Sequence, residues 1–169
     1  RLSIIYLINM VIDQTGENIL AKVARELVAP KKGILAADES TGTMKKRLDA
    51  IGVEATPENR SQWRKIMADA PGIEEVISGM ILFDETLRQP LPDGKMIADL
   101  LRSKNIHPGI KVDKGTVKFN EQEETFTQGL DKLEERLLEY KNMGAAFVKW
   151  RAVYKVGKKM PTPAAITAN

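Results

Sequence analysis

The feature that most constrains the fold is the alternation of short apolar runs with longer amphipathic segments. Each run is too short for a helix and is bounded by glycine or charged residues, which is typical of a buried strand. The four runs are residues 33–38, 77–83, 109–115 and 145–151. The predicted helices are residues 17–29, 44–51, 57–69, a segment capped by Asp93 that reaches Leu101, and 130–143. Strands that alternate with helices predict a parallel sheet built from βα units.

The number of βα units limits the choice of α/β fold. A closed (β/α)8 barrel takes about 250 residues, whereas this chain has 169 residues and four units. An open doubly wound sheet is the alternative, but neither a glycine-rich dinucleotide fingerprint nor a GxxxxGK[ST] loop follows any predicted strand. The pattern favours an α/β fold of the (β/α)8 TIM-barrel type with about the first four βα units present, and the open doubly wound sheet stays the alternative. Thr162-Pro163 predicts a helix start, so the sequence is expected to stop within a helix, as a truncated chain would.

The first residues and the composition exclude several classes of partner. The apolar run at residues 4–12 is shorter than the ~20 residues that cross a bilayer, and we expect no membrane partner. Because Met10 follows soon after Arg1, we predict that residues 1–9 are a non-native upstream segment and that residues 10–169 form half of one barrel domain. A net charge of +3 without an aromatic-interleaved basic cluster argues against nucleic acid. The absence of cysteine and the single histidine, His107, argue against a metal centre and fit a reducing cytoplasm.

Charged residues follow the predicted strands at the end where parallel α/β folds bind ligands. Alternate residues of a strand share a face, which places Lys111 with Asp113 and Lys149 with Arg151. A lysine in an apolar setting can form a Schiff base, and spacing alone makes Lys149 the nucleophile candidate. The alternative is that the lysines are solvated strand ends paired with Asp113 or Glu39, and that Asp38 and Ser40 only cap the next helix. Both interpretations stay open on spacing alone.

Six sequence motifs follow one another along the chain. They are GILAADESTGT (33–43), KKRL (45–48), SGMILFDETL (78–87), PGIKVDKGTV (108–117), TQGLD (127–131) and KWRAV (149–153). Together they resemble class I fructose-bisphosphate aldolase. The resemblance implies a (β/α)8 barrel without metal or cofactor, a homotetramer in many members, and a cytosolic role in glycolysis and gluconeogenesis. It also implies a sugar-phosphate substrate, fructose 1,6-bisphosphate, which is cleaved reversibly to dihydroxyacetone phosphate and glyceraldehyde 3-phosphate.

The resemblance assigns roles to residues that match the motifs. Asp38 matches the catalytic aspartate, and Lys149 matches the lysine that stabilises charge and assists proton transfer beside the Schiff base. The implied contacts to substrate phosphate or hydroxyls are Ser40, Thr43, Arg47, Arg60, Lys111 and Arg151. Thr43 stands where many members have serine, and the loop from Lys118 to Phe126 departs from the usual pattern. The family's Schiff-base lysine and its glutamate acid/base lie downstream of Asn169, so these 169 residues alone are expected to be inactive.

Other interpretations remain alongside the aldolase one. The chain could be a non-catalytic phosphate-binding or assembly module on an aldolase half-barrel, or a Schiff-base aldolase for another sugar phosphate. Residues 45–47 are either a solvated helix face or a first-turn cation cluster for phosphate. His107 is predicted to be structural, Trp63 and Trp150 to be packing residues, and the leucines of 130–138 to be core. A half-barrel would expose strand edges and tend to aggregate.

Overall fold

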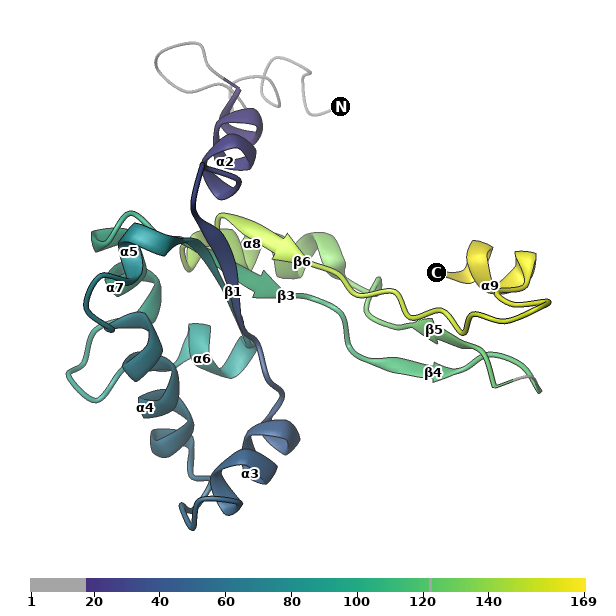
Figure 1. Ribbon diagram of the computed structural model, residues 1–169, viewed down its shortest axis with the longest axis horizontal. Coiled ribbons are helices and arrows are strands. Elements are labelled where there is room, and N and C mark those ends of the chain that lie inside the picture. The colour runs from purple at the N-terminus through teal and green to yellow at the C-terminus, as the bar shows by residue number, and fades with distance from the viewer. Residues whose placement is uncertain (1–17, 122) are drawn as a thin grey trace.

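The computed structural model describes residues 18–121 and 123–169, and its centre is a four-stranded parallel sheet (Figure 1). The strand order is β1-β2-β3-β6, so the strands lie side by side in the order of the chain. The strands are β1 (Gly33–Ala37), β2 (Ile77–Leu82), β3 (His107–Lys111) and β6 (Phe147–Lys149). The predicted sheet of four apolar runs is therefore confirmed. The predictions for residues 1–9 and for Met10 lie outside the described residues.

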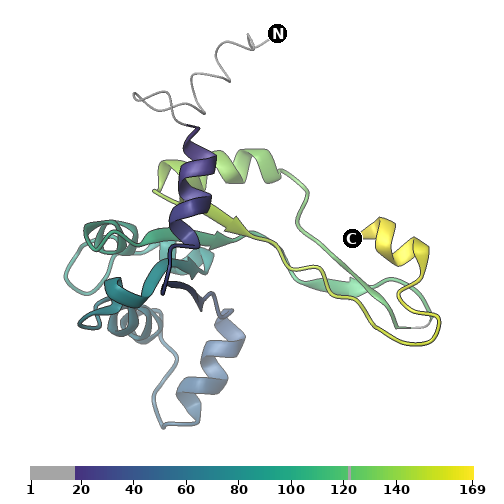
Figure 2. The ribbon, with the colours of Figure 1, turned by 45° about the horizontal axis from the view of Figure 1, so that its top comes forward.

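Helices connect the strands, and a separate hairpin follows β3. The helices are α2 (Ile19–Leu27), α3 (Thr41–Asp49), α4 (Pro57–Ala68), α5 (Ile73–Val76), α6 (Asp84–Arg88), α7 (Ile97–Ser103), α8 (Leu133–Asn142) and α9 (Pro163–Ala168). The hairpin pairs β4 (Thr116–Lys118) with β5 (Thr125–Thr127) in antiparallel register. Figure 1 shows the hairpin and α9 extending together away from the sheet, and we call this part the arm (β4, β5, residues 119–121, 123–124 and 152–169). Figure 2 shows α8 running alongside β6.

The caps explain where several helices begin. Thr56 and Thr162 accept hydrogen bonds from the backbone N–H groups of Asn59 and Ala165, at 3.2 Å each, and a proline follows each threonine. Both Thr-Pro helix starts are confirmed. The predicted cap at Asp93 is wrong: α7 begins at Ile97, because Asp93 lies in a turn and accepts the N–H of Lys95 at 3.2 Å.

The strands are shorter than the apolar runs that predict them. β3 ends at Lys111 rather than near Gly115, since the Asp113 carboxylate accepts the N–H of Gly115 at 3.1 Å and turns the chain. β6 covers only Phe147–Lys149 of the run at 145–151. Strand β1 lies at one edge of the sheet and β6 at the other within the described residues, and the aggregation this suggests stays a prediction.

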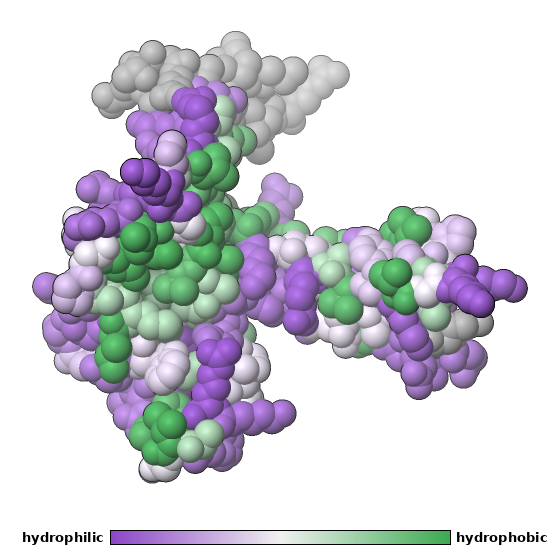
Figure 3. Space-filling view, viewed as in Figure 1, coloured by the Kyte–Doolittle hydropathy of each residue, from purple (hydrophilic) through white to green (hydrophobic). Residues whose placement is uncertain are grey.

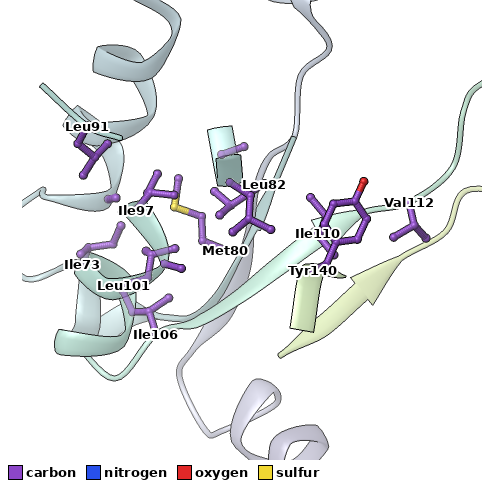
Figure 4. Packing of buried hydrophobic residues seen from close by; sticks show 14 residues of the cluster. Ile73, Met80, Leu82, Leu91, Ile97, Leu101, Ile106, Ile110, Val112 and Tyr140 are labelled. Atoms are coloured by element: carbon purple, nitrogen blue, oxygen red, sulfur yellow. The ribbon is translucent and has the colours of Figure 1, made fainter. Parts of the chain in front are cut away.

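The core lies between the sheet and the helices from α4 to α7. Figure 4 shows side chains of β2, such as Met80, beside Ile97, Leu101 and Ile106, and each of these four is at most 1% exposed. The other face of the sheet carries the Phe147 ring, which leaves no room for a Cβ at Gly109; at Gly79 the Leu27 side chain fills that space, and the ring lies close by. The glycines therefore let an aromatic ring lie across the strands.

The leucines of 130–138 are only partly core. Leu133 and Leu137 pack against the buried cluster, but Leu130 is 71% and Leu138 55% exposed, which corrects the prediction for these two. Leu130 precedes α8, which begins at Leu133, and only one face of that helix covers the core. Trp150 packs against the same cluster, as predicted, and Trp63 is half-buried. His107 starts β3 with its Nε2 2.8 Å from Glu26 Oε2, which fits the structural role predicted for it.

Candidate active site

A cavity of about 940 Å³ lies at the carboxyl ends of the four parallel strands. Its lining includes residues at or just beyond the end of each strand, because parallel strands bring these ends to one edge of the sheet. Most of the predicted site residues line it, namely Asp38, Ser40, Thr43, Arg47, Lys111, Lys149 and Arg151. Arg60 is the predicted residue that is not brought to the cavity.

Asp38 and Lys149 form an ion pair across the cavity, with 2.8 Å between Asp38 Oδ2 and Lys149 Nζ. The first residue follows β1 and the second ends β6, and two strands separate β1 from β6 in the sheet. Their contact shows that the sheet is concave at this end. The side chains are 11% and 33% exposed, so the pair can be reached from the cavity. Lys149 does pair with a carboxylate, as the alternative interpretation held, but with Asp38 and not with Asp113 or Glu39.

Lys111 contacts the residue predicted to share its face. Its Nζ lies 3.0 Å from Asp113 Oδ1 and donates to the Asp113 carbonyl at 3.0 Å. The Asp113 side chain is fully buried and also accepts the N–H of Gly115. The carboxylate therefore fixes both the ammonium of Lys111 and the turn that carries the chain away from β3.

Helix α3 places hydroxyl groups and a cation on the cavity wall. Ser40 caps the helix by accepting the N–H of Thr43 at 3.3 Å, and their hydroxyl oxygens lie 3.1 Å apart. Ser40 thus both caps α3 and lines the cavity. Arg47 pairs with Glu39, whereas Lys45 pairs with Asp49 at 2.6 Å outside the lining. Because α3 begins at Thr41, residues 45–47 lie beyond its first turn, and the first-turn cation cluster is wrong.

Arg60 lies behind the cavity, on the buried side of α4. Its Nε donates to Glu85 Oε2 at 2.8 Å, and its guanidinium also contacts Glu85 Oε1 and the Ala55 carbonyl. The hydrogen bond with Glu85 raises the pKa of Arg60. Arg60 is only 7% exposed, so its donors hold protein groups and none is directed to a ligand.

A polar cluster from α6 and α8 that also lines the cavity, formed by Asp84, Arg88, Glu139 and Tyr140, was not predicted from the sequence. The Tyr140 hydroxyl and Arg88 Nε both donate to Asp84 Oδ1 at 2.8 Å, and Arg88 also pairs with Glu139. Burial raises the pKa of Tyr140, and the hydrogen bond from Arg88 lowers the pKa of Glu139. The i,i+4 spacing of Asp84 and Arg88 could have indicated half of this cluster. Its other half comes from α8, more than fifty residues later, and has no local signal.

The lining is rich in both signs of charge, with cations in excess. The lysines and arginines are Arg47, Arg88, Lys111, Lys114, Arg136, Lys149 and Arg151, and the carboxylates are Asp38, Glu39, Asp84, Asp113 and Glu139. Such a site suits an anionic ligand, because arginine and lysine form charge-assisted hydrogen bonds to phosphate oxygens. Within residues 18–121 and 123–169, no three histidine, aspartate or glutamate side chains are grouped as a metal site requires. None of the helices in this same part is long and apolar enough to cross a membrane.

Consecutive parallel βα units and a charged cavity at their carboxyl ends define a protein of the (β/α)-barrel class. The chain belongs to the class I fructose-bisphosphate aldolase family, whose model matches residues 19–169. A solved aldolase from Plasmodium falciparum, in a complex with TRAP and a small-molecule inhibitor, superposes with a TM-score of 0.84 at 48% identity. This superposition covers 89% of the present chain and 44% of the Plasmodium chain.

Curated relatives agree with this assignment. A fructose-bisphosphate aldolase of Schistosoma mansoni is 49% identical over 158 residues, which are 92% of this chain and 44% of the relative. Fructose-bisphosphate aldolase 1 of Toxoplasma gondii is 51% identical over 152 residues, 88% of this chain and 42% of the relative. The chain thus spans less than half the length of these relatives.

Proposed function

We propose that the chain supplies part of the active site of a class I, Schiff-base fructose-bisphosphate aldolase. The reaction is the reversible cleavage of fructose 1,6-bisphosphate into dihydroxyacetone phosphate and glyceraldehyde 3-phosphate. The observation that carries the proposal is the Asp38–Lys149 pair at 2.8 Å inside a cavity rich in cations. Aldol cleavage needs a group that accepts a hydroxyl proton next to a group that stabilises developing charge, and this pair provides both.

The two residues divide the chemistry. The Asp38 carboxylate accepts the proton of the substrate hydroxyl whose carbon leaves as the aldehyde. The Lys149 ammonium pairs with this carboxylate and stabilises charge beside the Schiff base. The nucleophilic lysine that forms the Schiff base and the glutamate acid/base belong to the aldolase outside these 169 residues. Lys149 is an assistant in this scheme and not the nucleophile.

The cations and hydroxyls of the cavity bind the substrate phosphates and hydroxyls. The residues proposed for this role are Ser40, Thr43, Arg47, Lys111 and Arg151, all of which line the cavity. Charge-assisted hydrogen bonds are each worth roughly 1.5–3 kcal/mol, so losing one should weaken substrate binding measurably. Arg60 is left out of this set because its guanidinium is buried against Glu85.

Assembly, pathway and location follow from the same proposal. We propose a homotetramer that acts in glycolysis and gluconeogenesis in the cytosol. An Arabidopsis thaliana relative named as a cytosolic fructose-bisphosphate aldolase, 49% identical over 157 residues, supports the location. Residues 10–169 are proposed to form part of a single barrel domain.

The decisive experiment uses the protein expressed from the whole reading frame that contains these residues. We expect it to cleave fructose 1,6-bisphosphate and, with dihydroxyacetone phosphate and borohydride, to trap a covalent adduct on a lysine other than Lys149. The Asp38→Asn and Lys149→Met variants should lose about 10²-fold or more of kcat, as expected when a proton-transfer group is removed. Lys46→Met is the matched control, since Lys46 is exposed on α3 and does not line the cavity.

Two results would overturn the proposal. Absence of cleavage by the product of the whole reading frame would favour a non-catalytic phosphate-binding module. An adduct mapped to Lys149 would make Lys149 the nucleophile. Comparison of fructose 1,6-bisphosphate with fructose 1-phosphate would identify an aldolase for another sugar phosphate.

A further inference from the structure

We propose that Arg64 is the positioning residue for Asp38, because it holds the backbone on both sides of that carboxylate. The inference rests on the proposed aldolase function and adds to it a residue behind the cavity wall. Arg64 lies on α4, does not line the cavity, and has no part in the scheme described above.

The contacts of Arg64 bracket the catalytic carboxylate. Its Nε donates to the Ala37 carbonyl at 3.3 Å, and its terminal NH2 group donates to the Glu39 carbonyl at 2.6 Å. The planar guanidinium thus bonds the carbonyls of the two residues that flank Asp38. A fork of donors in fixed geometry sets direction as well as distance, which a single donor cannot do.

The same guanidinium also faces the Glu39 side chain. Its terminal nitrogen lies 3.8 Å from Glu39 Oε2, and the other carboxylate oxygen of Glu39 contacts Arg47 on the cavity wall. Arg64 is 0% exposed, and burial lowers the pKa of its guanidinium, although arginine stays protonated in proteins. A buried charge must be paired or hydrogen-bonded, and the carbonyls and carboxylate around Arg64 supply these partners. The surroundings of Arg64 therefore have little freedom to relax around a substituted side chain.

Position in the sheet explains why Asp38 requires this support. The paired register of β1 with β2 ends at Ala37 and Leu82, and β1 lies at the edge of the described sheet. The backbone of Asp38 is therefore beyond the ladder that fixes the rest of β1. The donors of Arg64 continue, from a helix, the hydrogen bonding that the neighbouring strand no longer supplies.

The alternative is that Arg64 only stabilises α4 against the sheet, and kinetics distinguish the two roles. In the product of the whole reading frame, Arg64→Lys and Arg64→Ala should lower kcat by about 10²-fold, the effect of displacing a catalytic group by about 1 Å. KM should change much less than kcat, because the variants keep every phosphate-binding side chain and only Arg47 is linked to Arg64, through Glu39. Millimolar guanidinium should restore part of the kcat of Arg64→Ala by occupying the vacated site, and should not raise that of the unsubstituted protein.

The matched control is Leu101→Ala, a buried change in α7 that destabilises the fold and, because leucine has no polar side-chain atom, removes no hydrogen bond to residues 37–39. We expect it to lower the melting temperature while kcat per folded molecule is retained. A wild-type kcat in both Arg64 variants would overturn the positioning role, as would a loss of kcat without any guanidinium rescue. If Arg64→Ala fails to fold, the kcat of Arg64→Lys decides alone. Failure of the unsubstituted protein to cleave fructose 1,6-bisphosphate would instead overturn the proposed function.

Discussion

The sheet with its helices and the arm are held together by different forces. Between the sheet and the helices α4 to α7, apolar side chains such as Met80, Leu82 and Leu101 are 0% exposed. In the arm, small Ala165 is buried, but larger apolar side chains are exposed, among them Val156 at 84%, and Figure 3 shows green residues scattered on the surface of the arm. Hydrophobic burial scales with the apolar area removed from water, so it stabilises the first region far more than the second.

The arm depends on a buried carboxylate. Glu124 is 1% exposed and accepts the backbone N–H of Thr162 and the Thr162 hydroxyl, each at 2.8 Å, as well as Asn120 Nδ2 at 2.6 Å. The hydrogen bond from the Thr162 backbone lowers the pKa of Glu124. Nearby, the Thr127 hydroxyl donates to the Arg151 carbonyl at 2.8 Å and its N–H donates to Asn169. Polar bonds thus join α9 to the hairpin, and they are specific in geometry but cover little apolar surface.

The largest effect is expected in the apolar core. Leu101→Ala should reduce the free energy of unfolding by about 2–5 kcal/mol, because it creates a cavity in addition to the lost burial. Denaturant unfolding of the product of the whole reading frame measures it. Ile66→Ala on α4 is the control, since Ile66 is 62% exposed and its loss should change the free energy by less than about 0.5 kcal/mol. Equal effects of the two variants would contradict the assignment of the core.

The two Thr-Pro helix starts allow the sheet region and the arm to be compared directly, since the same local motif begins α4 in the first and α9 in the second. Thr56→Ala should cost about 1 kcal/mol by removing the cap of α4. Thr162→Ala removes a cap and a donor to Glu124, yet its effect should be confined to the arm. Amide hydrogen exchange of residues 164–168 should accelerate in Thr162→Ala, while the amides of β2 stay protected. Loss of protection in β2 would show that the arm and the sheet unfold together.

A smaller effect on global stability is expected at Glu124. Glu124→Gln removes acceptor capacity for Thr162 and Asn120, so exchange in α9 should accelerate without a resolved change in the global unfolding transition. Glu123→Gln is the adjacent control, because the Glu123 side chain is 78% exposed. If both variants leave α9 exchange unchanged, Glu124 does not hold the arm.

The pH dependence of the arm follows from the same carboxylate. Because the native pKa of Glu124 lies below its ordinary value of 4.5, the stabilisation is fully present above that pH. It is lost as the pH falls through the lowered native pKa, when the carboxylate becomes protonated. Amide exchange in α9, followed across this range, should show the loss in the unsubstituted protein and not in Glu124→Gln.

Local patterns accounted for much of the fold and for most of the cavity lining. The apolar runs located all four strands of the sheet, and capping threonines located two helix starts. The helix start predicted at Asp93 was wrong because aspartate is common both at helix N-caps and in turns. Only the path of the chain after α6 decides which of the two forms. Leu130 and Leu138 were wrongly predicted to be core residues, because their spacing is helical while their exposure depends on what α8 packs against.

The sequence by itself determined the parallel order of βα units, the family and the residues that follow each strand, because these depend on neighbours a few positions apart. Only the tertiary structure decided which charges meet. Asp38 contacts Lys149 across 111 positions, and Arg64 holds the carbonyl of Ala37 across 27. The tertiary structure also placed Arg60 behind the cavity wall, and it brought Arg88 and Tyr140 into the lining of the cavity. The physical reason is that a polar partner is chosen by packing, curvature and burial, which no short stretch of sequence encodes.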